Sequence, residues 1–368
     1  MPGLSSLHIA VFPGDGIGVE VMSECIRLLN VLCERDRRLS LVFEHLEAGA
    51  DLYSRTGTAL PDSALDRAAR ADAILFGAMG LPHIRYADGR EVAPQLDLRE
   101  AFNLYAGVRP VRPIPGLKPV LADERAARID FVLVRESTEG LFARRQDGRM
   151  EGDRTATDVL EVTRGAVEKV SDFAFRLAAG RHSDRRATVT CVDKANVLSS
   201  LAFFRKVFDE VAKRHSNAAD ANHMYVDAAA LNFVRRPWDF DVIVTENMFG
   251  DILSDLGAAL LGGLGLAPSG DIGDDHAVFQ PCHGSAPDIM GTGKANPIGM
   301  LLSAAMMFDW LAGRHGHDPC REAAADLRGA IDRAFEIGAV LPIELGGTDT
   351  ASDVTNAIIA ELGPKRLR

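Results

Sequence analysis

The sequence predicts an α/β fold in which helices pack over a largely parallel sheet. Short runs of β-branched or aromatic residues alternate with longer amphipathic stretches along the chain. The strand-like runs lie at 7–12, 73–76, 130–134, 187–192 and 241–245. The helix-like stretches lie around 18–34, 158–180, 196–214, 297–313 and 320–337. A chain of 368 residues, 47% of them hydrophobic, can bury a core large enough for two domains or one large unit.

Three segments interrupt this alternation. Three prolines in 108–116 remove backbone donors, which predicts a rigid segment that crosses between domains. The glycine-rich run 262–270 follows a helix and can adopt backbone angles that are closed to other residues. The polar segment 142–158 predicts a loop or a protruding hairpin, with plain solvated surface as its simplest role.

The charge balance limits the kinds of partner. The 41 Lys and Arg residues against 52 Asp and Glu give a formal charge of −11, which repels nucleic acid and anionic membranes. Any anionic ligand therefore needs a local basic cluster. The most apolar stretch, 256–266, is shorter than the about 20 residues that span a bilayer. The chain starts without a basic segment followed by an apolar one, and its five cysteines are scattered, so we expect a cytoplasmic protein.

The first motif is the glycine-rich turn Phe12–Gly18, between a predicted strand and a predicted helix. Closely spaced glycines allow a backbone to approach a ligand. The spacing differs from a dinucleotide fingerprint, and no acidic residue ends a second strand at the expected distance. We therefore do not expect a Rossmann fold, and a tight turn alone accounts for these glycines.

Three arginines are candidates for binding an acidic substrate: Arg99, Arg109 and Arg135. Arg135 ends an apolar run that predicts a buried strand, and a buried guanidinium needs a carboxylate or a ligand as its partner. A ligand site and a structural ion pair with Glu136 or Glu139 are equally open at this point. If the three arginines converge, they form a bidentate clamp for a di- or tricarboxylate.

Two aspartates, Asp251 and Asp255, are spaced to lie on one face of a helix. Their carboxylates repel each other unless a cation joins them, and oxygen ligands suit Mg²⁺ or Mn²⁺. Asp227 is a candidate third ligand. The alternative interpretation is a solvated acidic helix face.

Lys194 follows a predicted strand and precedes a predicted helix. Close to a metal ion and carboxylates, such a lysine is suited to moving a proton, whereas an ordinary exposed lysine is the alternative. The segment 283–297 is rich in small residues and prolines, which predicts a rigid loop able to hold an adenosine. Asp288 in this loop can accept hydrogen bonds from ribose hydroxyls and would repel a 2′-phosphate, which favours NAD.

These segments, in this order and at these separations, resemble the β-decarboxylating dehydrogenases of the isocitrate/isopropylmalate dehydrogenase family, from Gly14 to the C-terminal helix. The resemblance implies an isopropylmalate dehydrogenase-like two-domain fold with a mostly parallel sheet in the first domain and an interdomain cleft. The implied dinucleotide-binding domain is 1–104 plus 262–368. The implied substrate, metal and dimerisation domain is 105–261.

The resemblance also implies the site residues. Arg99, Arg109 and Arg135 would hold the carboxylates of a substituted malate. Lys194 and Asp227 would form a catalytic pair that each subunit of a homodimer supplies to the other's site. The implied ligands of Mg²⁺ or Mn²⁺ are Asp227, Asp251 and Asp255. The implied dinucleotide contacts are Ile17, Asn196, His283, Gly284, Ser285, Ala286, Asp288, Ile289 and Asn296.

The implied reaction begins with removal of the C2 hydroxyl proton by Lys194, directly or through Asp227 and water, as hydride leaves C2 for the nicotinamide. The β-carboxylate then leaves as carbon dioxide while the metal ion stabilises the enolate. The chain departs from the family in three places. Phe142 replaces a tyrosine that assists protonation of the enol, Gln280 replaces a glutamate, and Val19 replaces a proline.

The substituent on C3 of the substrate is sensed in the family just before the first substrate arginine, here at Val92, Gln95 and Leu96. One amide beside apolar groups suits a small or polar substituent, so the sequence favours D-malate or tartrate. Three alternatives remain: a 3-isopropylmalate dehydrogenase of leucine biosynthesis, a 2-hydroxy acid dehydrogenase that does not decarboxylate because of Phe142, and a non-catalytic regulatory subunit.

Overall fold

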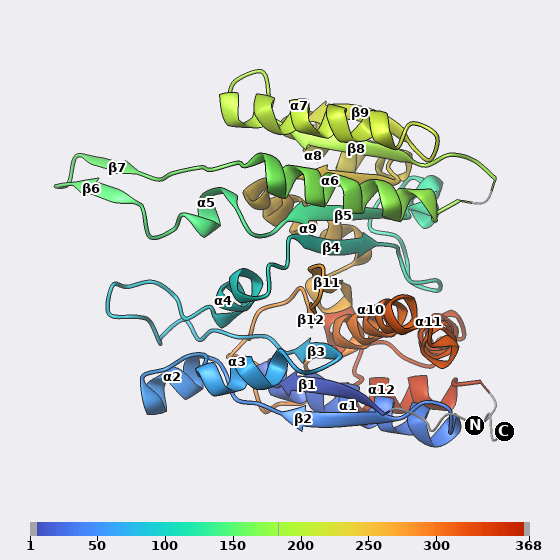
Figure 1. The fold of residues 1–368 in the computed structure, drawn as a ribbon. Helices are drawn as coiled ribbons and strands as arrows, with labels where there is room; N and C mark the ends of the chain where they lie inside the picture. Colours follow the sequence, from blue (N-terminus) through green and yellow to red (C-terminus); the bar gives the residue numbers. More distant parts are fainter. Residues whose placement is uncertain (1–5, 183, 364–368) are drawn as a thin grey trace.

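The computed structural model describes residues 6–182 and 184–363. Ten of its strands form one sheet in the order β2-β1-β3-β12-β11-β4-β5-β10-β8-β9 (Figure 1). Neighbours are parallel at both ends of the sheet, and antiparallel pairing is confined to the middle, where β11 and β4 lie. The ten strands are β1 (Leu7–Phe12), β2 (Leu41–His45), β3 (Ala73–Phe76), β4 (Ala106–Val111), β5 (Phe131–Glu136), β8 (Thr188–Asp193), β9 (Asp220–Tyr225), β10 (Val242–Thr245), β11 (Pro268–Ile272) and β12 (Ala277–Pro281).

Helices cover both faces of the sheet (Figure 1). They are α1 (Ile17–Arg35), α2 (Ala50–Thr56), α3 (Asp62–Ala68), α4 (Pro94–Ala101), α5 (Gly140–Ala143), α6 (Arg164–Ala179), α7 (Ser199–Arg214), α8 (Val226–Arg235), α9 (Asn247–Leu261), α10 (Ile298–His315), α11 (Asp318–Glu336) and α12 (Ala351–Ala360). Short 3₁₀ turns occur at Glu124–Arg128, Pro237–Asp239, Leu264–Leu266 and Ile343–Leu345. Within the described part of the chain, no helix combines the length and apolar character needed to cross a membrane.

The sequence periodicity located the main elements correctly. The five strand-like runs are β1, β3, β5, β8 and β10, and the five helix-like stretches are α1, α6, α7, α10 and α11. The proline-rich segment begins inside β4. Pro110 cannot donate a backbone hydrogen bond, but the antiparallel neighbours β5 and β11 pair with the rest of this strand. The segment after Phe142 contains a protruding hairpin of β6 (Arg149–Glu151) and β7 (Thr155–Thr157) (Figure 1).

The two halves of the sheet come from different parts of the chain. β1, β2, β3, β11 and β12 come from the two chain ends, whereas β4, β5, β8, β9 and β10 come from the middle (Figure 1). Among the described residues, the largest buried cluster extends from α1, α10 and α11 to Phe131 and Leu133 of β5 and Phe233 of α8, and a second lies around α6 and α7. The origin of the strands supports our proposal of two domains, 1–104 plus 262–368 and 105–261.

The glycine-rich turn after β1 packs closely against neighbouring backbone. Gly14 and Gly16 have positive φ angles, and a Cβ on either would lie within 2.2 Å of the carbonyl oxygen of Ala78 or Ser285. The buried Asp15 carboxylate accepts hydrogen bonds from the backbone amides of Ala50 and Gly80, at 2.7 and 2.8 Å. The turn therefore joins the loops that follow β2, β3 and β12.

Candidate active site

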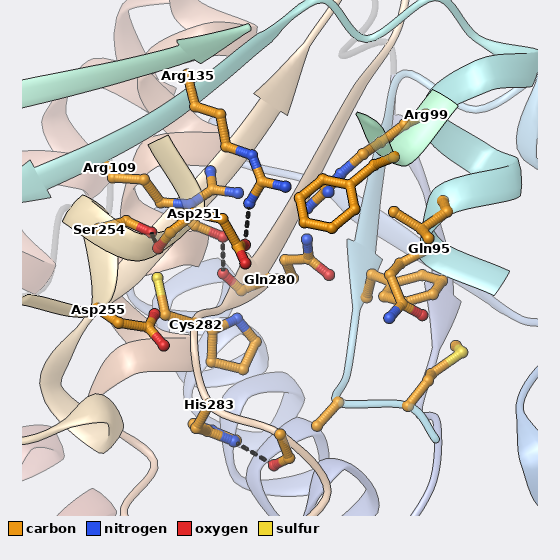
Figure 2. Close-up of a pocket in the computed structure, with 18 of the residues that line it drawn as sticks. Gln95, Arg99, Arg109, Arg135, Asp251, Ser254, Asp255, Gln280, Cys282 and His283 are labelled. Carbon is orange, nitrogen blue, oxygen red and sulfur yellow. Dashed lines mark hydrogen bonds and ion pairs between the residues drawn. The ribbon is translucent and has the colours of Figure 1, made fainter. Parts of the chain in front are cut away.

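A cavity of about 450 Å³ lies where α4, β4, β5, α9 and the loop after β12 meet (Figure 2). Its lining combines polar or charged side chains with apolar ones. The polar and charged residues are Glu91, Gln95, Arg99, Arg109, Arg135, Asp251, Ser254, Asp255, Ser269, Gln280 and His283. The remaining residues are Phe76, Ala78, Met79, Leu96, Phe142, Pro281, Cys282 and Gly284.

The three predicted arginines converge on this cavity (Figure 2). Arg99 near the end of α4, Arg109 in β4 and Arg135 in β5 are only 8%, 5% and 4% exposed. Neither Glu136 nor Glu139 is the partner of Arg135, because the Glu136 carboxylate accepts the backbone amides of Thr138 and Glu139, each at 2.8 Å. The ion pair that the structure forms is with Asp251, and a ligand site at Arg135 stays a prediction.

Arg135 is held by α9 instead. Its Nε and Nη2 donate to Oδ1 of Asn247 at 2.9 and 2.6 Å, and its Nη1 donates to Asp251. Gly250 leaves room for this side chain, since a Cβ there would lie 2.6 Å from Cγ of Arg135. Burial, with the nearby charge of Arg99, lowers the pKa of Arg135 to about 10. Burial thus disfavours the charged guanidinium, and a further carboxylate close to it would favour that charge.

The carboxylate of Asp271 on β11 lies between the other two arginines. It accepts Nε of Arg99 at 2.9 Å and Nη2 of Arg109 at 3.0 Å. Burial opposes its ionisation, but the charges of Arg99 and Arg109 lower its pKa to about 2. Asp271 is therefore an anion that balances one of the three positive charges.

Helix α9 presents Asp251 and Asp255 to the cavity (Figure 2). The helix begins where the side chain of Glu246 accepts the amides of Met248 and Phe249, at 3.0 and 2.6 Å. Burial raises the pKa of Asp255, and the charge of Asp251 raises it further. Two repelling carboxylates on one cavity wall fit a hard divalent cation.

Lys194 and Asp227 do not line this cavity. Lys194 lies just after β8, and its Nζ donates to the Asp227 carboxylate at the start of α8. This hydrogen bond lowers the pKa of Asp227. Among the described residues, no cluster of three His, Cys, Asp or Glu side chains is arranged to hold a metal ion. Asp227 therefore does not join Asp251 and Asp255 within one chain.

The predicted dinucleotide loop borders the cavity through His283 and Gly284. His283 Nδ1 lies 2.9 Å from its neighbour's carbonyl oxygen, so Nδ1 carries the proton, and the buried Nε2 has no hydrogen-bond partner among the described residues. Burial lowers the pKa of His283, which keeps the ring neutral. An unpaired acceptor at this position fits a donor group of a dinucleotide.

The other predicted dinucleotide contacts are divided. Ile17 and Ser285 are joined by a backbone hydrogen bond of 2.8 Å, and Ala286, Asp288 and Ile289 continue the same loop. Asn296 is engaged, since its Nδ2 donates to Glu344 at 2.8 Å. Asn196 is exposed beside Lys194 and lies outside the cavity lining.

Two of the three residues predicted to sense the C3 substituent line the cavity. These are Gln95 and Leu96, whereas Val92 is fully buried and packs with Ala50 and Ala59. Phe142 also lines the cavity, with the Arg135 guanidinium 5.3 Å from its ring centroid. The residues predicted to sense the substituent thus contribute one amide and one apolar side chain to the lining.

Sequence reasoning missed Asp271, Ser254 and Cys282 as cavity residues. One signal for Asp271 was available, because three converging arginines require a buried anion, and the segment 268–272 contains a single acid. Nothing in the sequence marked Ser254 or Cys282.

A mostly parallel α/β sheet with an arginine-lined cavity beside paired aspartates fits an enzyme that acts on small carboxylic acids. A family model described as isocitrate/isopropylmalate dehydrogenase matches residues 8–358. A homoisocitrate dehydrogenase of Methanocaldococcus jannaschii is 44% identical, over 86% of this chain and 89% of that protein. A 3-isopropylmalate dehydrogenase of Heyndrickxia coagulans is 39% identical over 98% of both chains.

Solved structures agree with these relatives. The isocitrate dehydrogenase from Methylococcus capsulatus superposes with a TM-score of 0.84 at 32% identity, covering 96% of this chain and 99% of that one. The chain belongs to the isocitrate/isopropylmalate dehydrogenase family, and it is a decarboxylating dehydrogenase that acts on a CH–OH group. Members of the family generally depend on NAD(P) and a divalent metal ion, and they act on small carboxylates as dimers.

Proposed function

We propose that the protein is a cytoplasmic homodimer that uses NAD and Mg²⁺ or Mn²⁺ to oxidise and decarboxylate D-malate or tartrate. The choice of substrate rests on the side-chain amide of Gln95, which lines the cavity together with Leu96. The buried Oε1 of Gln95 has no hydrogen-bond partner among the described residues. An unpaired buried acceptor costs about 1–3 kcal/mol, which the C3 hydroxyl of tartrate would offset, whereas D-malate carries no donor on C3. A branched alkyl substituent would leave this oxygen unpaired.

A second candidate is a malate with a larger C3 substituent. The names of the relatives point to 3-isopropylmalate or homoisocitrate. Phe76, Leu96 and Phe142 on the cavity wall support the apolar substituent of 3-isopropylmalate. A C3 hydroxyl would donate a hydrogen bond to Gln95, whereas an apolar C3 substituent would not. A substitution at Gln95 therefore distinguishes the two candidates.

The arginines would orient the acid. Arg99 would offer its two terminal nitrogens to one carboxylate of a malate, and Arg109 and Arg135 would add positive charge on the cavity wall. Asp251 and Asp255 would hold the divalent cation, which supplies Lewis-acid stabilisation of the oxygen on C2. With the carboxylates fixed, the C2 hydroxyl is presented to a base at a defined position.

The base would come from the second subunit. Lys194 and Asp227 form a hydrogen-bonded pair outside their own chain's cavity. Apolar side chains close to this pair in sequence, and one on α9, are exposed: Val197 by 67%, Leu231 by 54% and Ile252 by 60%. A face of this kind supports subunit contact. Lys194 of one subunit would then accept the hydroxyl proton in the other subunit's cavity, directly or through Asp227 and water.

NAD is proposed over NADP because of Asp288. Its carboxylate is exposed on the loop after β12 and would repel a 2′-phosphate while accepting ribose hydroxyls. His283, with its unpaired Nε2, would bind the same dinucleotide.

The test is a substrate panel. Purified protein with NAD and Mn²⁺ is given D-malate, L-tartrate, isocitrate, 3-isopropylmalate and homoisocitrate, and NADH and carbon dioxide are recorded together. We expect equal NADH and carbon dioxide from D-malate or tartrate. Gln95→Leu should move the preference toward 3-isopropylmalate by roughly 10–200-fold. Wild-type preference for 3-isopropylmalate or homoisocitrate would instead support the second candidate.

A further inference from the structure

The buried Asp271 carboxylate controls how Arg99 presents its guanidinium. Asp271 is 1% exposed and binds Arg99 through Nε alone, at 2.9 Å. No hydrogen bond within residues 6–182 and 184–363 involves the two terminal nitrogens of Arg99. Because the fork is fixed at Nε, these nitrogens remain available to a ligand carboxylate.

Arg109 is fixed by the same carboxylate in a complementary way. Its Nη2 donates to the second oxygen of Asp271 at 3.0 Å, and its Nη1 donates to the carbonyl oxygen of Val108 at 3.1 Å. Asp271 thus uses one oxygen for each arginine. A single buried group sets the orientation of two of the three arginines.

Gln280 completes the network from β12. Its Nε2 donates to Oδ2 of Asp271 at 2.9 Å, and its side chain lines the cavity. Its backbone carbonyl accepts hydrogen bonds from the hydroxyls of Ser269 and Ser303, each at 2.8 Å, which fixes the backbone of Gln280. A glutamate at this position would place a second carboxylate against Asp271.

We propose that Asp271 is the positioning residue of the substrate arginines, and that Gln280 supports it as the amide half of an acid–amide pair. The inference rests on the proposed role of Arg99 and Arg109 in binding the acid. The pair needs one carboxylate and one amide, since two carboxylates repel and two amides leave three arginines without a buried anion. Exchanging the two groups preserves the net charge and one acid–amide hydrogen bond.

Three variants test the proposal: Asp271→Asn, Gln280→Glu and the double exchange Asp271→Asn/Gln280→Glu. For each, KM and kcat are measured for the hydroxy acid and for NAD, with the melting temperature. We expect either single change to raise KM for the acid by about 10-fold to 100-fold. KM for NAD and kcat should change little, because the arginines bind ground and transition states alike.

The double exchange is the deciding variant. We expect it to recover most of the acid affinity, so that the two changes are strongly non-additive in KM for the acid. Non-additivity in melting temperature alone, with additive effects on KM, would show a merely structural pair and overturn the proposal. An unchanged KM in Asp271→Asn would also overturn it.

Two further measurements separate this inference from the proposed function. If a single variant fails to fold, Gln280→Leu, which removes the amide donor without adding charge, should raise KM for the acid by a smaller factor. A wild-type protein that neither oxidises nor binds any acid of the panel, by calorimetry, would refute the proposed function and this inference together. If the wild type is active and Asp271→Asn leaves KM for the acid unchanged, only this inference is refuted.

Discussion

Arg135 on β5 donates a hydrogen bond to Asp251 on α9, so a cation proposed to bind substrate neutralises an acid proposed to bind metal. Each ligand must compete with this ion pair when it binds alone. The first ligand to bind therefore breaks the ion pair and leaves the other side chain available to the second ligand.

We predict cooperative binding of Mn²⁺ and the hydroxy acid. An ion at Asp251 frees Arg135 for the substrate, so Mn²⁺ should tighten acid binding by about 10-fold, or about 1.4 kcal/mol. Calorimetric titration with and without Mn²⁺ measures this. In Asp251→Asn the metal effect should disappear; equal affinities in the wild type, with and without Mn²⁺, would contradict the prediction.

Exchange of Phe142 for tyrosine should accelerate the decarboxylation half-reaction. Phe142 lines the cavity and cannot donate a proton, whereas a positioned phenol can protonate the enol. We predict that Phe142→Tyr raises the rate of carbon dioxide release by roughly an order of magnitude. Rapid-quench measurement of carbon dioxide against NADH checks it. Phe142→Leu is the matched control and should give no gain.

The shared active site predicts complementation between two inactive variants. Lys194→Ala and Asp255→Asn should each lack activity as homodimers. A heterodimer isolated by two different affinity tags should recover about half of the wild-type activity, because one of its two sites is intact. An inactive heterodimer would place Lys194 in its own chain's site.

The neutral state of His283 predicts a specific loss of stability in mild acid. Burial lowers its pKa below the ordinary value of 6.5. Its contribution is therefore complete above pH 6.5 and is lost as the pH falls toward the folded-state pKa. The melting temperature should drop more between pH 7.5 and 5.5 in the wild type than in His283→Asn. The exposed His83→Asn should behave like the wild type.

The sequence was most informative where periodicity or charge carries the signal. Strand runs such as 73–76 and the spacing of Asp251 and Asp255 depend on local geometry, and the structure has both as expected. β11 and β12 were not predicted, because both are short, β11 starts with a proline and contains a glycine, and β12 ends with a proline. Asp271 was missed with them, since its role depends on arginines far away in the chain.

Residues that look adjacent in sequence can also separate in space. Val92 precedes Gln95 by less than one helical turn, yet it is buried in a different cluster because α4 begins only at Pro94. Likewise, Asp227 lies apart from Asp251 and Asp255 within one chain, as expected if each subunit supplies Lys194 and Asp227 to the other's site.

The position of β11 and β12 in the middle of the sheet governs the order in which the molecule can assemble. During synthesis, β1, β2 and β3 emerge early, but the neighbour of β3 is β12, which follows almost all of the central elements. Until then the edge of β3 is open, and open edges invite pairing with other chains. Late closure of long-range contacts also slows folding. We therefore expect newly made chains truncated before residue 277 to aggregate rather than fold.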